Sequence, residues 1–532
     1  MLDRIGNQVE PVRAAEGWLH EPIIAPAQLI GANGMRLGAD KKLYVAQAFG
    51  SQISAVDIES GAVDIVSPAD GAIIAPDDLA FDSRGNLFAT EVMSARVSAI
   101  RPNGAVDVIA SDVPVANGVT VHQDRIFMSE FRADGRIMEL HADGAPPKVV
   151  TTGLMAPNAL SMGADGHLYF PLVPLGEVWR VNAEGGEAEK VAGGFDIPTA
   201  VKFDADGTLV VVESRSGAVT RLDPVTGKRS EIAKVAFGID NLEIVPGKGI
   251  FVSHFTDGGI VHIDGTTVKT CLRGAMLGPF GMTVSHRGGL IIADGMSIAT
   301  LAPDGTAKRV AMLLQHGFPG YIRNVVEESD GALICTNSAG DLARYRPGGE
   351  TEMIATGIDT PMGLIAAPEG GWLVCEQGSG RVLYVDRSGG INVVAEGLDK
   401  PAGLALAPDG QLYVSEMGSG RLVVVVDGAP RQLLSGMIEP HGVAVLGEMA
   451  LVVDRMAGKV MGVSRRDGHA TVLASGLPTG SGAGRRINTP PGITGLMPGP
   501  LSAFADLSVL ADGRICIGCD GDGSVLMLSR RH

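Results

Sequence analysis

Six polar residues recur about every forty residues through the first half of the chain and could together bind a metal ion. They are Asn33, Asp77, Asn117, Asn158, Thr199 and Asp240. Carboxylate and amide oxygens without sulfur or histidine form a hard oxygen environment that suits Ca²⁺ or Mg²⁺. Asn and Asp also favour turns, but that structural explanation covers one or two positions more easily than an unbroken polar run. The first half therefore predicts a divalent-metal site.

The equivalent positions in the second half are mostly apolar and predict no metal site. They are Phe280, Arg323, Met362, Ala402, His441 and Ala505. His441 could act as a general acid or base near neutral pH, or it could be a structural residue in a repeat position. Arg323 could bind a substrate carboxylate or a partner's acidic group, or it could pair with a neighbouring acid. The two halves thus differ in the chemistry that they offer.

The element that must position these residues is a repeated unit, clearest in Lys400–Arg421. Short apolar strands at 404–406 and 411–416 are separated by Pro-Asp-Gly, and two further strands follow Gly-Ser-Gly. Alternating β-branched residues bounded by such turns indicate a four-stranded meander. A meander with two apolar faces must stack on its copies, and at this period a β-propeller is expected. The opening of the innermost strand recurs twelve times, which predicts an all-β chain of two six-bladed β-propellers.

The division of the chain between the two rings depends on where the chain ends meet. The last unit, at 524–528, lacks an outer strand, whereas residues 11–17 resemble an outer strand, so pairing them would close a blade. We expect a first ring of 1–235 plus 500–532 and a second ring of 236–476. The Gly/Pro-rich connection 477–499 would return the chain to the first ring. A simple split into blades one to six and seven to twelve stays open and would require the N-terminal strand to cross between rings.

Acidic residues also recur at the end of the second strand of many units, and they predict a structural role. They are Glu91, Glu130, Glu213, Glu376, Glu416 and Asp454. A residue required once per blade is expected to bond the adjacent turn rather than a substrate.

Composition limits the partners of the chain. Its 532 residues have a net charge of −17, which disfavours nucleic acid and anionic membranes as partners. The N-terminus has no signal-like apolar segment, and no stretch approaches the ~20 apolar residues of a membrane span. We therefore expect a cytoplasmic protein with a small-molecule substrate, and self-association into a homo-oligomer stays open.

The first-half openings GANGM, APDDLAF, VANGVTV and APNALSM resemble the senescence-marker/gluconolactonase family and its paraoxonase-like relatives. The resemblance implies a six-bladed propeller with a channel metal held by Asn and carboxylate side chains, and lactone or ester hydrolysis. Asn117 and Asn158 match the family's amide ligands, and Asp77 is the best candidate carboxylate. Asn33 stands where the family uses Glu. Second-half units such as YVSEMGSGR resemble NHL repeats, which are often interaction modules.

Two further motifs resemble those of related propellers. Asp240-Asn241 resembles an Asp-Asn ligand pair of the paraoxonase-like enzymes, and its membership of the metal site depends on the ring division. Pro440-His441-Gly442 resembles the Pro-His-Gly of paraoxonase-like and virginiamycin-lyase-like propellers.

These observations predict a divalent-metal-dependent hydrolase of a small lactone or ester. The expected ion is Ca²⁺, with Mg²⁺ or Zn²⁺ as alternatives, held by Asn33, Asp77, Asn117, Asn158 and Asp240. Asp77 and His441 are the candidate catalytic residues, and Thr199 and Arg323 the candidate substrate-binding residues. The alternatives are a metal-dependent lyase or isomerase using His441 as base, and a non-enzymatic NHL-type binding scaffold.

Overall fold

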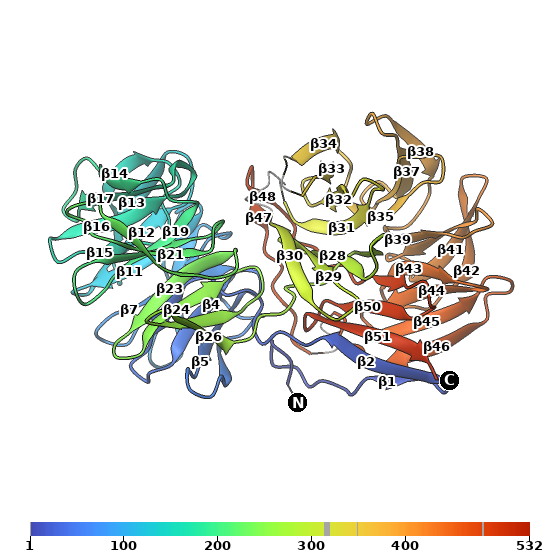
Figure 1. Ribbon diagram of the computed structural model, residues 1–532, viewed down its shortest axis with the longest axis horizontal. Helices are drawn as coiled ribbons and strands as arrows, with labels where there is room; N and C mark the ends of the chain where they lie inside the picture. The colour runs from blue at the N-terminus through green and yellow to red at the C-terminus, as the bar shows by residue number, and fades with distance from the viewer. Residues whose placement is uncertain (1, 313–319, 348, 350, 481–483, 532) are drawn as a thin grey trace.

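The computed structural model describes residues 2–312, 320–347, 349, 351–480 and 484–531. It confirms an all-β chain of two β-propellers that lie side by side (Figure 1). Among the described residues the strands are interrupted by one short 3₁₀ helix, η1 (Val173–Leu175). None of the helical structure in these residues has the length and hydropathy needed to cross a bilayer.

The first six blades are built from strands that follow one another in the sequence. Their bounds are: blade one, β3 (Met35–Leu37), β4 (Leu43–Gln47), β5 (Gln52–Val56), β6 (Val63–Ser67); blade two, β7 (Pro76–Phe81), β8 (Leu87–Glu91), β9 (Arg96–Ile100), β10 (Val106–Ser111); blade three, β11 (Ala116–His122), β12 (Arg125–Glu130), β13 (Gly135–Leu140), β14 (Lys148–Leu154); blade four, β15 (Ser161–Met162), β16 (His167–Leu172), β17 (Glu177–Asn182), β18 (Glu189–Gly193); blade five, β19 (Pro198–Phe203), β20 (Leu209–Glu213), β21 (Ala218–Leu222), β22 (Arg229–Lys234); blade six, β23 (Ile239–Val245), β24 (Gly249–His254), β25 (Ile260–Asp264), β26 (Thr267–Leu272).

The last six blades include two strands from the N-terminus. Their bounds are: blade seven, β27 (Met282–Val284), β28 (Leu290–Asp294), β29 (Ser297–Leu301), β30 (Ala307–Met312); blade eight, β31 (Ile322–Glu327), β32 (Leu333–Asn337), β33 (Leu342–Tyr345), β34 (Thr351–Ala355); blade nine, β35 (Pro361–Ala366), β36 (Trp372–Glu376), β37 (Arg381–Val385), β38 (Ile391–Ala395); blade ten, β39 (Pro401–Leu406), β40 (Leu412–Glu416), β41 (Arg421–Val426), β42 (Ala429–Leu434); blade eleven, β43 (Pro440–Leu446), β44 (Met449–Asp454), β45 (Lys459–Ser464), β46 (Ala470–Ser475) with β1 (Arg13–Ala14); blade twelve, β49 (Leu507–Val509), β50 (Ile515–Cys519), β51 (Ser524–Arg530) with β2 (Trp18–Ile24).

The innermost strand of several blades begins with an irregularity at the residue that points toward the central channel. In blades two, three, five and six the pairing register shifts at the predicted channel residue, for example between Pro76 and Leu79 around Asp77. The residue two positions earlier has a positive φ, as at Ala75 (φ 50) and Ile197 (φ 56). A bulge of this kind redirects a side chain, and a positive φ is costly for a β-branched residue such as Ile197. The same positive φ occurs in the second ring at Thr360 and Lys400. This backbone conformation is therefore a feature of the repeated blade and is not confined to the site.

Blades one to six form the first ring. Blade six packs against blade five through β19 and β23, and against blade one through β23 and β3. A hydroxyl on the second strand of one blade repeatedly donates to the channel-residue carbonyl of the next, as Ser129 does to Asn158 (3.0 Å). Ser253 in blade six makes the same bond to the Asn33 carbonyl of blade one (2.7 Å). This bond joins the last blade of the first ring to its first.

Blades seven to twelve form the second ring, which the N-terminal strand closes. β2 pairs with β51 from Trp18↔Arg530 to Ile24↔Val525, so the predicted completion of the last blade by the N-terminus is confirmed. The strand that completes it is not the predicted segment 11–17, whose β1 pairs with β46 of blade eleven. Blade twelve packs against blade seven through β49 and β27, and Ser508 donates to the Met282 carbonyl (2.8 Å).

The predicted division into 1–235 plus 500–532 and 236–476 is therefore wrong. It assumed that the blade completed by the N-terminal strand belongs to the first ring. In the structure this blade belongs to the second ring: the chain passes from β2 into the first ring, builds blades one to six, and then returns to the second ring. The predicted connection 477–499 does not lead back to the first ring. It joins β46 to β49 within the second ring and contains the short hairpin of β47 (Gly492–Ile493) and β48 (Met497–Pro498).

Most of the recurrent acids accept backbone N–H groups that precede the innermost strand of their own blade, which agrees with the predicted structural role; Glu130 instead pairs with the side chains of Arg132 and Arg136. The Glu91 carboxylate accepts the Ile74 N–H (2.6 Å), and Glu213 accepts the Asp196 N–H in the same way (2.7 Å). Glu376 and Glu416 repeat the arrangement in the second ring. These side chains are structural.

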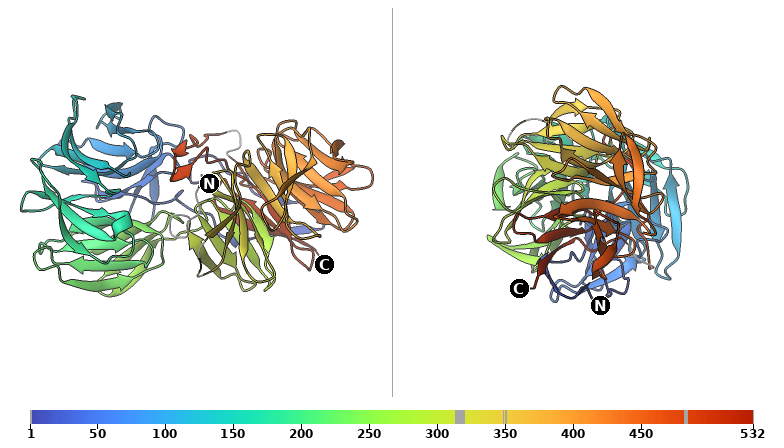
Figure 2. Two further views of the ribbon diagram at one scale, coloured as in Figure 1. Left: turned by 90° about the horizontal axis from the view of Figure 1, so that it is seen from above. Right: turned by 90° about the vertical axis from the view of Figure 1, so that its right-hand side faces the viewer.

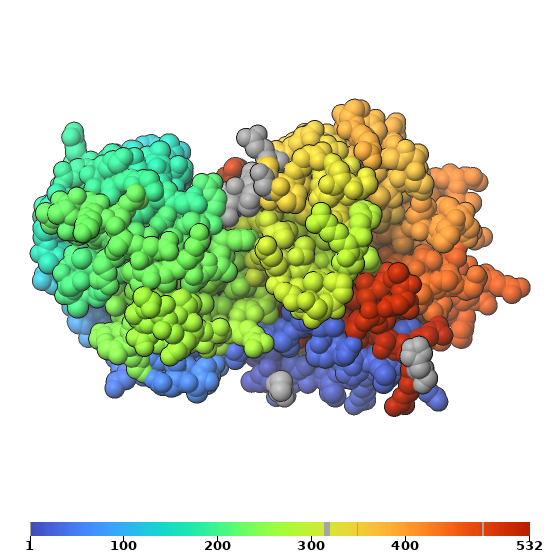
Figure 3. Space-filling model, in the orientation of Figure 1, coloured from blue at the N-terminus to red at the C-terminus, as the bar shows by residue number. Residues whose placement is uncertain are grey.

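The two rings contact each other through the N-terminal segment and the β47–β48 hairpin (Figure 2). The buried Arg4 guanidinium donates to the carbonyls of Met276, Leu277, Asp520 and Gly521 on the second-ring side, and the Arg4 carbonyl accepts Gln52 Nε2 of the first ring (2.9 Å). Phe49 of the first ring packs edge-to-face on Tyr321 of the second, with centroids 5.5 Å apart. The space-filling view shows the rings in direct contact, with the dark blue N-terminal residues along the second ring (Figure 3).

Candidate functional site

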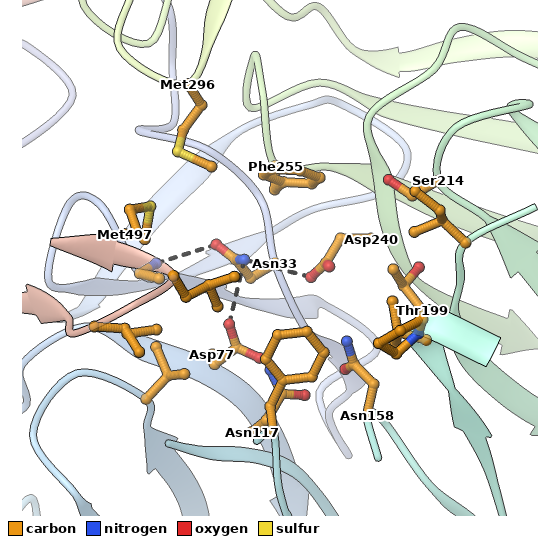
Figure 4. A pocket seen from close by; sticks show the side chains of 18 of the residues that line it. Asn33, Asp77, Asn117, Asn158, Thr199, Ser214, Asp240, Phe255, Met296 and Met497 are labelled. Atoms are coloured by element: carbon orange, nitrogen blue, oxygen red, sulfur yellow. Dashed lines mark hydrogen bonds between the residues drawn. The ribbon is translucent and has the colours of Figure 1, made fainter. Parts of the chain in front are cut away.

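The six polar channel residues of the first ring all line one cavity of about 440 Å³. Each comes from a different blade, so the structure brings Asn33, Asp77, Asn117, Asn158 and Thr199 together as predicted, and it adds Asp240, whose membership the sequence leaves open (Figure 4). Asp240 belongs to this group because blade six lies in the first ring. With Ser214, these residues form the polar floor of the cavity.

Asn33 lies between the two carboxylates of the floor. Its Nδ2 is 3.4 Å from Asp77 Oδ1 and 3.4 Å from Asp240 Oδ2. Its Oδ1 accepts the Ala48 N–H at 3.2 Å, which fixes the orientation of the amide. One amide N–H₂ group thus bridges two acids from blades two and six.

Burial raises the pKa of both carboxylates. The pKa of Asp77 lies well above its usual range because the group is buried and faces the charges of Asp240 and Asp78. The pKa of Asp240 is raised by burial and by Asp78, and the Asn33 hydrogen bond opposes this only in part. Two buried acids without a facing cation resist ionisation, whereas a bound cation would favour their charged forms.

Three oxygens of the floor have no hydrogen-bond partner among the described residues: Asn117 Oδ1, Thr199 Oγ1 and Ser214 Oγ. Buried polar atoms are almost always paired, so three unpaired oxygens on residues that line one cavity mark this cavity as a candidate binding site. Asn158 differs, because its Oδ1 accepts the N–H of the neighbouring Ala159 (2.7 Å). The Asn158 side-chain oxygen therefore stabilises the backbone next to it in this arrangement.

This set of donors fits a hard divalent cation. Among the described residues, no group of three or more His, Cys, Asp or Glu side chains has the spacing of a metal site. A metal would instead be held by the two carboxylates together with amide and hydroxyl oxygens. No His or Cys is among the described residues lining the cavity, and oxygen-only ligation suits Ca²⁺ or Mg²⁺ better than Zn²⁺.

The structure does not bring His441 into this cavity, because blade eleven belongs to the second ring. His441 is 1% exposed, its Nε2 is 3.1 Å from Glu439 Oε1, and its Nδ1 accepts the Ala505 N–H (3.3 Å). Burial lowers its pKa below the usual range. The pairing of His441 with Asp77 as catalytic residues is therefore wrong, since His441 does not line the cavity that contains Asp77 and belongs to a blade of the other ring.

Arg323 also lies outside the cavity and has a structural environment. Its guanidinium donates to the carbonyls of Pro361 (3.2 Å) and Pro500 (3.1 Å), and it is 1% exposed. Burial lowers its pKa to about 10. A substrate-binding role for Arg323 at the candidate site is excluded by this position.

Sequence reasoning missed the apolar part of the cavity, which comes partly from the second ring. The second ring supplies one side of the cavity, which we call the apolar roof. It consists of Met296 and Met312 of blade seven and of Ile493, Leu496 and Met497 of the hairpin. Figure 4 shows Met296 and Met497 beside the polar floor. The sequence feature that could have indicated this apolar side is the presence of apolar residues within the otherwise Gly/Pro-rich connection 477–499.

No protein-family model matches the chain, and no curated protein matches it. Among solved structures, a streptogramin B lyase is similar at 17% identity over 61% of this chain and 96% of that chain, with a TM-score of 0.34. A gluconolactonase-like protein is similar at 16% identity over 50% and 99%, with a TM-score of 0.37. A chain of a nidogen/laminin complex is similar at 19% identity over 37% and 78%, with a TM-score of 0.34. Identities and TM-scores this low do not identify a reaction.

Proposed function

We propose that the first ring is a divalent-metal-dependent hydrolase of a small lactone or ester, and that Ca²⁺ or Mg²⁺ is its cofactor. The observation that supports this most is the floor itself, where two buried carboxylates flank Asn33, and where Asn117 and Thr199, whose side-chain oxygens have no partner among the described residues, line the same cavity. Such a site has the charge and the donors for one divalent cation and leaves room for a small organic molecule.

Asp77, Asp240 and Asn117 would hold the cation, with Asn33 and Thr199 beside them. When bound, the ion would supply Lewis-acid polarisation of the substrate carbonyl. Asp77 is the candidate residue to orient or deprotonate the attacking water, since a bound cation would keep its carboxylate in the charged form that accepts a proton. Asn33 holds the two acids at a fixed separation through its Nδ2. The apolar walls, among them Phe49 and Phe255, limit the access of bulk water.

Hydrolysis is better supported than elimination. A lyase or isomerase on this scaffold was expected to use His441 as base, and His441 lies in the other ring. An elimination would need Asp77 or Asp240 for that task. Incorporation of solvent oxygen into the product separates the two reactions, because hydrolysis incorporates it and elimination does not.

Metal titration of the purified protein tests the proposal, with Asp77→Asn and Asp240→Asn as site variants. We expect about one divalent ion per chain in the native protein, loss of lactone or ester hydrolysis after chelation, and recovery on adding Ca²⁺ or Mg²⁺. Each variant is expected to bind metal at least tenfold more weakly. Asp264→Asn, an exposed position in blade six, is the matched control.

The pH dependence of metal binding gives a second readout. Protons compete with the cation for carboxylates whose pKa is raised, to about 7 for Asp240, so binding should be weaker at pH 6 than at pH 8. Full activity in metal-free protein, or equal metal affinity in Asp240→Asn and Asp264→Asn, would contradict the proposal.

A further inference from the structure

The cavity of the first ring is completed by the second ring. Its polar floor comes entirely from blades one to six, whereas the apolar roof comes from blade seven and from the β47–β48 hairpin between blades eleven and twelve. Figure 2 shows this hairpin, in red, beside the blades of the first ring. A substrate bound at the floor would therefore also contact residues of the second ring.

The hairpin is attached to both rings, so its position is fixed. On the first ring, Asn488 donates its N–H to the Ala69 carbonyl (2.9 Å) and its Nδ2 to the Gly71 carbonyl (2.9 Å), and it accepts Ser51 Oγ (2.8 Å). On the second ring, the Pro498 carbonyl accepts Ser338 Oγ (2.5 Å). These contacts anchor the segment before and after the side chains that line the cavity.

The side chains of the roof provide apolar contact without charge. Met296, Met312 and Met497 are thioethers, and Ile493 and Leu496 are aliphatic. Methionine side chains adapt to differently shaped apolar ligands. The one cation among the described lining residues, Arg215, is paired with Asp196 at 2.6 Å. Polar recognition is thus confined to the floor.

We infer that the ligand of this site is an uncharged lactone or ester with an apolar chain of several carbons, whose polar end lies on the floor and whose chain lies against the apolar roof. Leu496 and Met497 are then specificity-determining residues supplied by the connection within the second ring. The lactone or ester part of this inference rests on the proposed function, whereas the apolar chain rests on the roof alone.

Binding of non-hydrolysable lactams with alkyl chains of two to eight carbons, measured by calorimetry, tests the roof without requiring catalysis. In the native protein the dissociation constant should fall about threefold to fourfold for each buried methylene. In Leu496→Gln and Met497→Gln this dependence should flatten, with at least tenfold weaker binding of the longest lactam and less than threefold change for the shortest. Thr494→Gln is the matched control, because Thr494 is exposed on the same hairpin.

The outcomes separate the two proposals. Chain-length-dependent binding that the roof variants flatten, without hydrolysis of the matching lactones, would support the roof and overturn the proposed reaction. Hydrolysis of short and long lactones at equal rates, with lactam affinity independent of chain length, would support the reaction and overturn the roof. Equal effects of Leu496→Gln and Thr494→Gln on the affinity for the longest lactam would also overturn the proposed role of the roof. Metal content of every variant is measured to show that the floor is intact.

Discussion

At the scale of single residues, the candidate site is defined by which polar atoms have partners and which do not. Thr199 and Thr90 are both buried threonines near the channel of the first ring. Thr90 Oγ1 accepts the Asp78 N–H (3.0 Å) and donates to the Asn117 carbonyl, whereas Thr199 Oγ1 has no partner among the described residues. The first hydroxyl has a structural role, whereas the second makes no hydrogen bond that the described residues supply.

Replacing each threonine by valine should therefore have opposite consequences. Thr199→Val removes an unpaired buried hydroxyl, so stability should be unchanged or slightly increased while metal or lactam binding weakens at least fivefold. Thr90→Val leaves the Asp78 N–H and the Asn117 carbonyl unpaired and should cost about 1–3 kcal/mol. Thermal unfolding and calorimetric binding measure the two effects. Destabilisation by Thr199→Val with unchanged binding would show that Thr199 is structural.

Much of the residue-level site could be predicted because the repeat aligns one residue per blade with the channel. Asn33, Asp77, Asn117 and Asn158 follow from that frame alone. The hydrogen bonding of each side-chain amide could not be predicted. Asn117 and Asn158 look equivalent in sequence, but only the Asn158 oxygen accepts the N–H of the next residue, whereas the Asn117 oxygen has no partner among the described residues. The structural roles of His441 and Arg323 could not be predicted, because a repeat position gives the place in a blade but not the partners of the side chain. These partners are Glu439 and the Ala505 N–H for His441, and the Pro361 and Pro500 carbonyls for Arg323.

At the scale of strands and blades, the first ring closes without an exchanged strand. Beneath the floor, Lys202 of β19 pairs with Glu243 of β23 and donates to the Met35 carbonyl of β3 (3.0 Å). Glu243 also accepts the Leu37 N–H (3.2 Å). Burial lowers the pKa of Lys202 to about 8, although Glu243 and Asp78 oppose this. One buried ion pair therefore joins blades five, six and one.

Breaking this pair should destabilise the first ring. Lys202→Met or Glu243→Met alone leaves a buried partner without its counter-charge and should cost about 3–5 kcal/mol, whereas the double variant should cost clearly less than the sum. Urea unfolding followed by Trp179 fluorescence, in a Trp18→Phe/Trp372→Phe background, reports on the first ring alone. Additive effects would show that the two side chains contribute independently.

At the scale of the whole molecule, the first ring is inserted into the second. The chain forms β1 and β2, builds the whole first ring, and only then supplies blades seven to twelve. The twelve blades could be predicted from local strand and turn patterns. The ring division could not, because the pairing of β2 with β51 joins residues at the two ends of the chain and is compatible with either ring.

Removing residues 1–25 should unfold the second ring selectively. The deletion takes away β1 and β2, so β51 loses its outer neighbour and the second ring loses its closure. Calorimetry should show a lowered or lost transition for the second ring, while the Trp179 signal of the first ring persists. Removing residues 1–10 is the control, because it deletes the Arg4 contacts but keeps β1 and β2. Equal effects of the two deletions would assign the stability to Arg4 rather than to strand closure.

The pairing of β2 with β51 also has a consequence during synthesis on the ribosome. β2 is made among the first residues and its partner among the last, so at 5–20 residues per second it waits roughly half a minute or longer for that partner. The first ring can fold during this interval, since each of its blades is complete once its four strands have emerged. β2 meanwhile remains an unpaired strand that could pair with another nascent chain. Chains that terminate early, before β51, would keep that edge exposed and are expected to aggregate although their first ring is intact.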